Sequence, residues 1–377
     1  MQAVNRRNWI KQSSLAALGL GISLRSIAGE DYLPRNFGSE LGLINLGANE
    51  NPYGISPKAK EAIMQMIGEA NRYQFNVTSL KSFTKQLAEY YGVTESHILV
   101  TAGSGEGLAL LARHFNKGNI VTADPTFGIL PSAAKKIGTK VIEVPLTQSK
   151  VHDLDAMLKA INEKTNLVYI CNPANPTSTI VKPAILKNFC IEAARKTVVL
   201  IDEAYIDFLD APDNESMISL IEKNPNVLVI RTFSKIHAMA GLRVGFIIGH
   251  PSRIDQIEPN YFQNSQICVS NLSLAAALAS LHDEEHRRQC KQKNADARQF
   301  TFDELVKLKY NVIPSYTNFI FFQLKNYAGN FGEDMLKKNI ILRSMDNKNG
   351  KWARVSIGTL DEMKIFISTM KALQTGP

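Results

Sequence analysis

A lysine that follows two hydroxyl residues and precedes an arginine forms the stretch with the clearest chemical potential. These residues are Thr232, Ser234, Lys235 and Arg243. Hydroxyls and a planar guanidinium bind phosphate well, and a lysine amine can form a Schiff base with an aldehyde. Pyridoxal phosphate (PLP) carries both groups. We therefore expect Lys235 to hold PLP covalently, with the hydroxyls and Arg243 at its phosphate and two helical turns between Lys235 and Arg243.

The residues before this stretch indicate what positions it. Val227–Ile230 is a continuous apolar run, typical of a strand that is buried on both faces. Lys235 then lies just past the carboxyl end of a strand, where open α/β sheets bind their ligands. A surface loop is the alternative for an isolated Ser-Lys pair.

A second apolar run, Val198–Ile201, ends in Asp202. A buried aspartate is costly unless it is paired, and a protonated pyridine nitrogen is a suitable partner. We expect Asp202 to keep the cofactor ring protonated and Tyr205 to reach its phenolic oxygen, where it tunes the pKa of the lysine–cofactor linkage. Asp-Glu after a strand also occurs at magnesium sites of ATPases, but the Gly-x-x-x-x-Gly-Lys-Ser/Thr motif is absent.

Two Asn-Pro pairs follow the apolar run Leu167–Cys171. The residue before a proline favours extended backbone, which leaves the Asn175 side chain free to donate its amide to the cofactor's phenolic oxygen.

A glycine-rich turn joins a predicted strand, His97–Val100, to a predicted helix, Leu108–Ala112. Amides at such a helix start can hold a phosphate. Three residues are expected to bind the cofactor there: Ser104, Gly105 and Glu106. A dinucleotide-binding fold is the alternative, since Asp124 ends a second strand about twenty residues on. However, the glycines are spaced Gly-x-Gly-x-Gly, and a dinucleotide site gives Lys235 no role.

From Asn45 to Thr369 the chain resembles class I/II aminotransferases, the aspartate aminotransferase superfamily, and most nearly histidinol-phosphate aminotransferases. Five segments carry the resemblance: Asn49–Pro52, Gly103–Glu106, Asn172–Pro176, Asp202–Tyr205 and Ser234–Arg243. The resemblance implies an α/β fold of the fold type I PLP-dependent transferases. Such a fold has a large domain with a mostly parallel central sheet flanked by helices, and a smaller α/β domain. Ser178 stands where the family usually has glycine, which leaves the shape of that loop open.

The resemblance also implies roles for residues that would otherwise pass as core or loop positions. It places Phe127 flat against the pyridine ring, Tyr73 across a homodimer interface at the phosphate, and Asn49 in the substrate pocket. Arg354 is expected to bind the substrate carboxylate with its planar fork. Arg343 is a second basic candidate for a polar substrate tail, with a surface ion pair as the alternative.

The reaction implied by the resemblance is transfer of an amino group from an amino acid or amino-alcohol phosphate to a 2-oxo acid, with Lys235, Asp202 and Tyr205 as catalytic residues. Two alternatives stay open. A lyase of the threonine-phosphate decarboxylase type would use the same cofactor residues. A non-enzymatic PLP-binding protein is the other, although regulators of that type usually add a DNA-binding domain, for which this chain has no basic helix-turn-helix segment to spare.

No metal site is expected. His282 and His286 lie in a stretch of interleaved acids and bases typical of a solvated helix. The four cysteines show no Cys-x-x-Cys spacing, which favours buried free thiols.

The segment 1–28 resembles a twin-arginine export signal. Arg6 and Arg7 precede Leu15–Ile22, an apolar run too short for a permanent membrane anchor, and cleavage after Ala28 is expected. This predicts use of the export machinery and a periplasmic or other extracytoplasmic enzyme. A disordered or amphipathic leader on a cytoplasmic protein is the alternative.

The composition is that of an ordinary globular enzyme: 377 residues, 45% of them hydrophobic and 21% charged. The net charge is +8, of which the acid-free segment 1–28 contributes four, and the remainder is too mildly basic to indicate nucleic acid. The expected divisions are a signal (1–28), an arm joining the small domain (29–55), a large PLP-binding domain (56–284) and a small domain (285–377).

Overall fold

The computed structural model describes residues 42–73, 78–262, 269–325, 327–347 and 350–374. Contacts group Ile44–Pro377 into one compact unit, separate from Met1–Leu43. The predicted export signal and Cys268 lie outside the described residues; the other three cysteines are buried free thiols. Within the described part, no helix combines the length and apolar character needed to cross a membrane.

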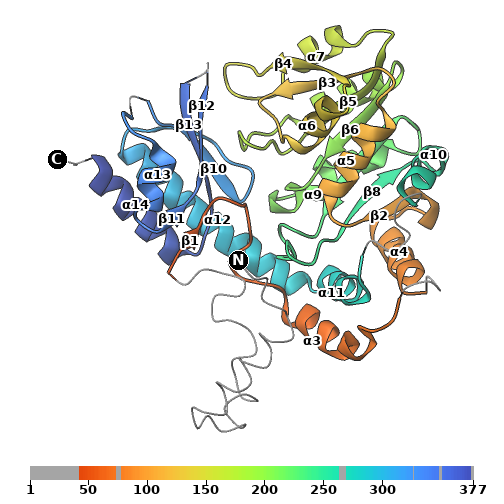
Figure 1. Cartoon of the computed structure of the whole chain (residues 1–377), viewed down its shortest axis with the longest axis horizontal. Coiled ribbons are helices and arrows are strands. Elements are labelled where there is room, and N and C mark those ends of the chain that lie inside the picture. Colours follow the sequence, from red (N-terminus) through yellow and green to blue (C-terminus); the bar gives the residue numbers. More distant parts are fainter. Residues whose placement is uncertain (1–41, 74–77, 263–268, 326, 348–349, 375–377) are drawn as a thin grey trace, which may run out of the picture. The chain divides into compact units, whose positions relative to one another are not determined.

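A seven-stranded sheet forms the centre of this unit (Figure 1). Its order is β2-β8-β7-β6-β5-β3-β4, and β8 alone runs antiparallel to its neighbours. The strands are β2 (Ile98–Thr101), β3 (Asn119–Asp124), β4 (Lys140–Pro145), β5 (Thr165–Cys171), β6 (Val198–Asp202), β7 (Val227–Thr232) and β8 (Gly245–Gly249).

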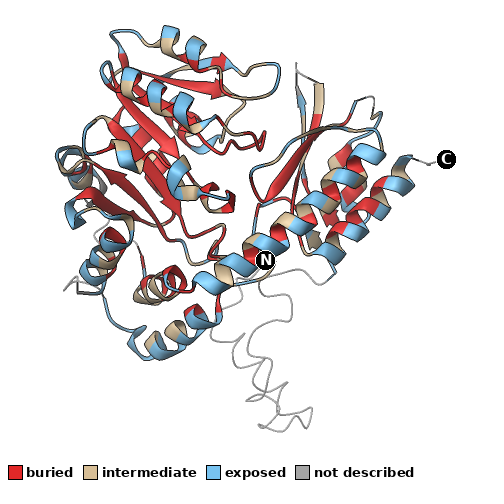
Figure 2. Cartoon of the chain, turned by 180° about the vertical axis from the view of Figure 1, so that it is seen from behind, coloured by how far each residue is buried: buried red, intermediate tan, exposed pale blue. Residues whose placement is uncertain are grey.

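Helices cover both faces of the sheet, so successive strand residues enter two different cores. One core includes residues of α3 (Pro57–Met66), α4 (Thr78–Tyr91), α7 (Leu154–Ala160), α8 (Pro183–Ala194) and α11 (Asn271–Leu281). The other includes residues of α5 (Ser104–His114), α6 (Ile129–Lys136) and α10 (Pro251–Phe262). Figure 2 shows the buried residues concentrated in the strands between these helices. The expected α/β architecture with a mostly parallel sheet is confirmed.

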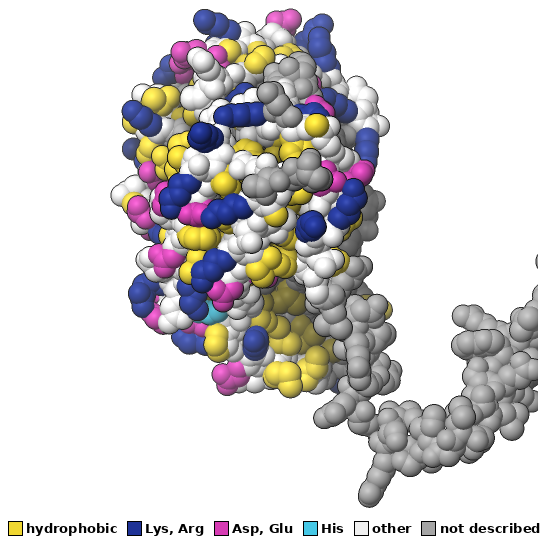
Figure 3. Space-filling view, turned by 90° about the vertical axis from the view of Figure 1, so that its left-hand side faces the viewer, with side chains coloured by type: hydrophobic (Ala, Val, Ile, Leu, Met, Phe, Trp, Pro, Cys, Tyr) yellow, Lys and Arg dark blue, Asp and Glu magenta, His cyan; other side chains and the backbone are white. Residues whose placement is uncertain are grey.

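The C-terminal part has its own apolar core and an antiparallel sheet of order β12-β13-β10-β9. Its elements are α12 (Glu284–Lys307), β9 (Asn311–Ile313), β10 (Phe319–Gln323), α13 (Phe331–Leu336), β11 (Ile340–Ile341), β12 (Arg343–Asn347), β13 (Gly350–Ser356) and α14 (Leu360–Gln374). The sequence did not indicate β12, because its polar residues lack apolar alternation. On the face in Figure 3, basic and acidic side chains are interspersed.

A short strand ties the N-terminal arm to the C-terminal part. β1 (Ile44–Asn45) pairs in parallel with β11, and Leu46 lies in the C-terminal core. The expected arm (29–55) that joins the small domain stays a prediction. The boundary between domains at residues 284 and 285 stays a prediction.

The segment from Lys235 to Arg243 differs from the expectation of two helical turns. After β7 the chain passes through turns, with the Ala238 N–H donating to the Lys235 carbonyl (3.0 Å), and β8 begins at Gly245. Ala238 and Arg243 have φ angles of +58° and +54°, which interrupt a right-handed helix. Lys235 and Arg243 therefore lie on an irregular loop and not on consecutive turns of one helix.

A buried ion pair supports the strand ends that carry the site. Arg231 on β7 donates through Nε and Nη2 to Oε2 of Glu203 (3.0 and 2.8 Å). Glu203 is the residue that follows Asp202 in the chain. Glu203 Oε1 also accepts from the Met217 N–H (2.7 Å), and the Arg231 guanidinium lies 4.9 Å from the Tyr91 ring centroid. The pair thus has the additional contacts that a buried charge requires.

Replacing Glu203 with Gln should destabilise the protein by about 3–5 kcal/mol, because the Arg231 charge stays buried without a counter-charge. Urea unfolding of the apoprotein measures this change. Glu285→Gln is the matched control, since Glu285 pairs with Arg288 at 2.7 Å on an exposed helix face and should show no measurable effect. Equal stability of the two variants would contradict the prediction.

Candidate active site

The predicted site residues from different strands meet at one edge of the central sheet. β5, β6 and β7 are parallel neighbours, so their carboxyl ends lie side by side. Asp202 ends β6, and Lys235 lies just beyond the end of β7. Burial is the largest cause of the pKa shift of each group, and the charge of the other group opposes that shift.

Asp202 is a buried carboxylate, 1% exposed. Its Oδ2 accepts from the Tyr169 hydroxyl (2.9 Å) and its Oδ1 from the Ala204 N–H (3.2 Å). Burial raises the pKa of Asp202 to about 6, although both hydrogen bonds oppose the rise. A hydrogen-bonded cation would compensate the buried charge of this carboxylate, and a protonated ring nitrogen is such a cation.

Lys235 is held by the loop that contains Asn49. Its Nζ donates to the carbonyl oxygens of Asn49 (3.0 Å) and Ala48 (3.4 Å) and lies 5.6 Å from the Tyr205 ring centroid. Burial lowers the pKa of Lys235 to about 8, and the Arg354 charge contributes in the same direction. A larger share of the amine is therefore unprotonated near neutral pH than in a free lysine.

A hydrogen-bond network surrounds the Tyr205 hydroxyl. The Nδ2 groups of Asn49 (3.0 Å) and Asn175 (3.2 Å) both donate to it. Burial raises the pKa of Tyr205. Asn175 Oδ1 in turn accepts from Arg354 Nη1 (2.7 Å). The structure thus brings together residues from four segments that are far apart in the sequence.

Both candidate substrate arginines reach one backbone carbonyl. Arg354 Nη2 donates to the Gly47 oxygen at 2.8 Å and Arg343 Nε at 3.4 Å. The two arginines are directly opposite each other on β13 and β12. Arg354 is half-buried, and its Nε is buried with no hydrogen-bond partner among the described residues, whereas Arg343 is exposed. The orphaned donor of Arg354 fits an anionic ligand.

The start of α5 and Arg243 form a compact cradle. Ser104 and Gly105 lie in the first helical turn, where backbone N–H groups have no intrahelical acceptor. A Cβ at Gly103 would collide with the Arg243 guanidinium, so glycine permits this close approach. Arg243 Nη1 also reaches Ser234 Oγ (3.4 Å). Fixed amides beside a guanidinium and a hydroxyl fit a phosphate.

Two residues of this region take supporting positions. The Glu106 carboxylate accepts from the Ala102 N–H (2.6 Å), so its side chain holds the turn that leads into α5. Thr232 Oγ1 donates to Ser234 Oγ (2.9 Å) and accepts from the Ser234 N–H (3.1 Å). Both residues therefore shape the phosphate cradle, and direct contact with the cofactor stays a prediction for each.

The remaining predicted residues are less closely tied to the cluster. Phe127 is half-buried against one core of the sheet, beside Thr126, whose buried Oγ1 has no partner among the described residues. Tyr73 is 76% exposed. Its expected action across a subunit interface involves a second copy of the chain and stays a prediction.

Three residues that support the site were not identified from the sequence. Tyr169 orients Asp202, Ser356 Oγ donates to Asn49 Oδ1 (3.0 Å), and Asn318 Nδ2 donates to the Asn49 carbonyl (3.1 Å). Tyr169 lies on the strand next to Asp202, so a polar residue within the β5 apolar run was a usable signal. Nothing local marks Ser356 or Asn318, which act over long sequence separations.

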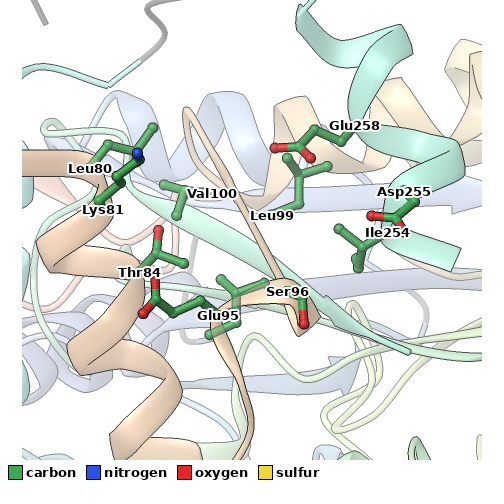
Figure 4. A pocket seen from close by; sticks show the side chains of 11 residues that line it. Leu80, Lys81, Thr84, Glu95, Ser96, Leu99, Val100, Ile254, Asp255 and Glu258 are labelled. Atoms are coloured by element: carbon green, nitrogen blue, oxygen red, sulfur yellow. The ribbon is translucent and has the colours of Figure 1, made fainter. Parts of the chain in front are cut away.

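A separate cavity of about 340 Å³ lies beside the edge strand β2, between α4 and α10 (Figure 4). Three carboxylates line it together with apolar side chains: Glu95, Asp255 and Glu258. None of the predicted site residues contributes to its lining, so its chemistry gives no reason to place the active site there.

The sequence and the fold are similar to those of known aminotransferases. Residues 42–370 match the family model "Aminotransferase class I and II". A histidinol-phosphate aminotransferase from Bacillus licheniformis is 34% identical over 335 residues, covering 88% of this chain and 91% of that protein. One from Brevibacillus brevis is 35% identical over 353 residues, covering 92% and 94%. The structure of histidinol-phosphate aminotransferase from Sinorhizobium meliloti in complex with pyridoxal-5'-phosphate has a TM-score of 0.79 at 22% identity, covering 94% and 98%, which shows a shared fold.

Proposed function

Because the chain belongs to the aminotransferase class I and II family and is a PLP-dependent aminotransferase, we propose that it transfers an amino group from an amino acid or amino-alcohol phosphate to a 2-oxo acid. The observation that carries the proposal is the hydrogen bond of Arg354 to Asn175. This hydrogen bond joins a guanidinium that would bind the substrate's anionic group to a side chain that would donate to the cofactor's phenolic oxygen.

The described residues fit PLP on several counts. Asp202 would accept a hydrogen bond from the protonated ring nitrogen, which compensates its buried charge. Tyr205 and Asn175 would face the phenolic oxygen. The phosphate would be held by the cradle residues Ser104, Gly105, Ser234 and Arg243. When bound, PLP supplies an aldehyde that takes up the amino group and a ring that withdraws electrons from the α-carbon.

The chain's own residues then perform three tasks. Lys235 would hold the cofactor through its aldehyde and would move a proton at the substrate α-carbon. Its pKa of about 8 suits this role, because the amine can both accept and release a proton near neutral pH. Arg354 would orient the substrate through its carboxylate or phosphate. Burial raises the pKa of Tyr205 and keeps its hydroxyl protonated, so it can donate a hydrogen bond.

The relatives named histidinol-phosphate aminotransferase support an amino-alcohol phosphate as donor, whose anionic group is its phosphate. Arg343 lies directly opposite Arg354 and reaches the same Gly47 carbonyl, which supports an amino acid with a second anionic group as a further donor. A substrate held by Arg354 at one end would meet Arg343 with a phosphate or carboxylate at the other.

A panel of amino donors tests this function. Purified holoenzyme is mixed with each donor, and the conversion of its absorbance to the pyridoxamine phosphate form is recorded. We expect conversion with amino-alcohol phosphates and with amino acids that carry a second anionic group, and little with aliphatic amino acids that lack one. Release of carbon dioxide without this conversion would favour the decarboxylase alternative and would refute the proposed transamination.

Homodimer formation is a further proposal. Tyr73 and the α3 residue Met64 are 76% and 70% exposed, and large exposed hydrophobic side chains of this kind support a subunit interface. Light scattering of the purified protein measures the assembled mass, and a monomer mass would refute the proposal.

Export is proposed on the sequence of the N-terminal segment. The pair Arg6 and Arg7 supports the twin-arginine route and an extracytoplasmic location. Fractionation of cells that express the wild type and an Arg6→Lys/Arg7→Lys variant tests this proposal. Cytoplasmic retention of the wild type would refute it.

A further inference from the structure

A tight loop between β4 and α7 presents a lysine toward β13. The Thr147 N–H donates to the Val151 carbonyl (2.9 Å), and the Lys150 N–H donates to the Thr147 carbonyl (2.9 Å). Lys150 has a φ of +64°, within the left-handed region, so the turn fixes the direction in which its side chain leaves the loop.

The Lys150 ammonium lies over an aromatic pair. Its Nζ is 5.0 Å from the Trp352 ring centroid, and Trp352 stacks on Phe321 with centroids 4.7 Å apart and planes 7° apart. This geometry is that of a cation–π interaction. Trp352 and Arg354 are two residues apart on β13, so both side chains leave the strand on the same face.

The same loop is bound to the loop that carries Asn175. The Lys150 carbonyl accepts from Thr179 Oγ1 (2.9 Å), and the Thr179 carbonyl accepts from the Ala174 N–H (2.8 Å). Lys150 therefore contacts the Asn175 loop through its backbone and β13 through its side chain. The hydrogen bond between Asn175 and Arg354 bridges the same two segments (2.7 Å).

We propose that Lys150 and Trp352 form a clamp that positions Arg354 for the carboxylate of the substrate. A carboxylate bound bidentately by the Arg354 fork would compete with the Asn175 and Gly47 acceptors, which would weaken the bridge that Arg354 makes between the two segments. The Lys150–Trp352 contact uses neither Arg354 nor Asn175, so it keeps β13 aligned with the loop when a carboxylate binds. Both are positioning residues. The inference rests on the proposed role of Arg354 in binding carboxylates.

Steady-state kinetics of the holoenzyme with 2-oxoglutarate as acceptor test the clamp. Lys150→Met keeps the aliphatic stem and removes the charge; we expect the KM for 2-oxoglutarate to rise about tenfold with kcat within about twofold. Lys150→Arg retains a cation over the ring and should restore the wild-type KM. Lys196→Met, which removes an exposed positive charge, is the control for net charge.

A double-mutant cycle separates the clamp from the role of Arg354. Arg354→Gln should raise the same KM, and adding Lys150→Met to it should cause no further rise. If Arg354→Gln raises the KM and Lys150→Met does not, the clamp is refuted while the role of Arg354 stands. If Arg354→Gln leaves the KM unchanged, the role of Arg354 is refuted and the clamp with it. Additive effects of the two substitutions would also refute the clamp.

Discussion

Replacing Lys235 with Ala should remove covalent attachment of PLP and lower transamination by at least about 10⁴-fold, because in the proposed function this one side chain supplies both the amine and the proton-transfer group. The loop that contains Asn49, which Lys235 contacts, should keep its conformation in this variant, because Asn318 Nδ2 still donates to the Asn49 carbonyl (3.1 Å). Borohydride reduction followed by mass spectrometry measures attachment, and product formation from the best donor measures turnover.

Lys325→Ala is the matched control for this substitution. The Lys325 Nζ also donates to a backbone carbonyl, that of Lys309 (2.6 Å), but it belongs to the C-terminal part of the chain and to none of the predicted site segments. The Lys325→Ala variant should attach PLP and turn over its substrates to the same extent as the wild type. A PLP adduct of unchanged mass on Lys235→Ala would place the reactive amine elsewhere and overturn the assignment.

The strand-end residues were predictable from the sequence for a physical reason. Apolar runs identify parallel buried strands, and parallel strands bring their carboxyl ends to one edge of the sheet. Asp202, Asn175 and Lys235 follow three such runs, which form adjacent strands in the structure. The fold class and the PLP-dependent aminotransferase family, both expected from these motifs, are confirmed.

Other parts of the site depend on contacts that local patterns do not encode. The backbone at Asn49 has a φ of +54°, and this residue is held by Ser356 and Asn318 from the C-terminal part. Turns replace the expected helix after Lys235, where Ala238 has a positive φ. Long-range packing decides such conformations, so spacing along the chain could not reveal them.

The backbone conformation of Ser178 bears on its departure from the family pattern, which usually has glycine at this position. The resemblance left the shape of its loop open, and the structure places Ser178 at a φ of +61°, where glycine is favoured. Its hydroxyl donates to the Thr177 carbonyl (2.5 Å), and its own carbonyl accepts from the Tyr316 N–H (2.9 Å). The loop thus holds a glycine-like conformation with a serine, close to Asn175.

Replacing Asp202 with Asn should stabilise the apoprotein at neutral pH. It should also lower transamination by about 10²–10³-fold, because the ring nitrogen of PLP would lose the charged partner that we propose for it. The stability effect follows from the pKa of Asp202, which burial raises from 3.8 to about 6. The folded state holds this proton more tightly than the unfolded state, so wild-type stability falls as the pH rises from about 4 to about 6. Above that range the ionised carboxylate costs about 3 kcal/mol.

The substitution removes this cost but weakens the hydrogen bond from the Ala204 N–H, at about 1 kcal/mol. We therefore expect the Asp202→Asn apoprotein to be about 2 kcal/mol more stable than the wild type at pH 7 and to lose the decline between about pH 4 and 6. Urea unfolding of wild type and variant between about pH 4 and pH 7 measures the free energy of unfolding and its dependence on pH. Asp213→Asn, at an exposed position on α9 (Pro212–Glu215), is the control. Full turnover by Asp202→Asn would show that Asp202 is not the partner of the cofactor's ring nitrogen. A variant with the wild-type pH profile of stability would show instead that the buried carboxylate is already compensated without the cofactor.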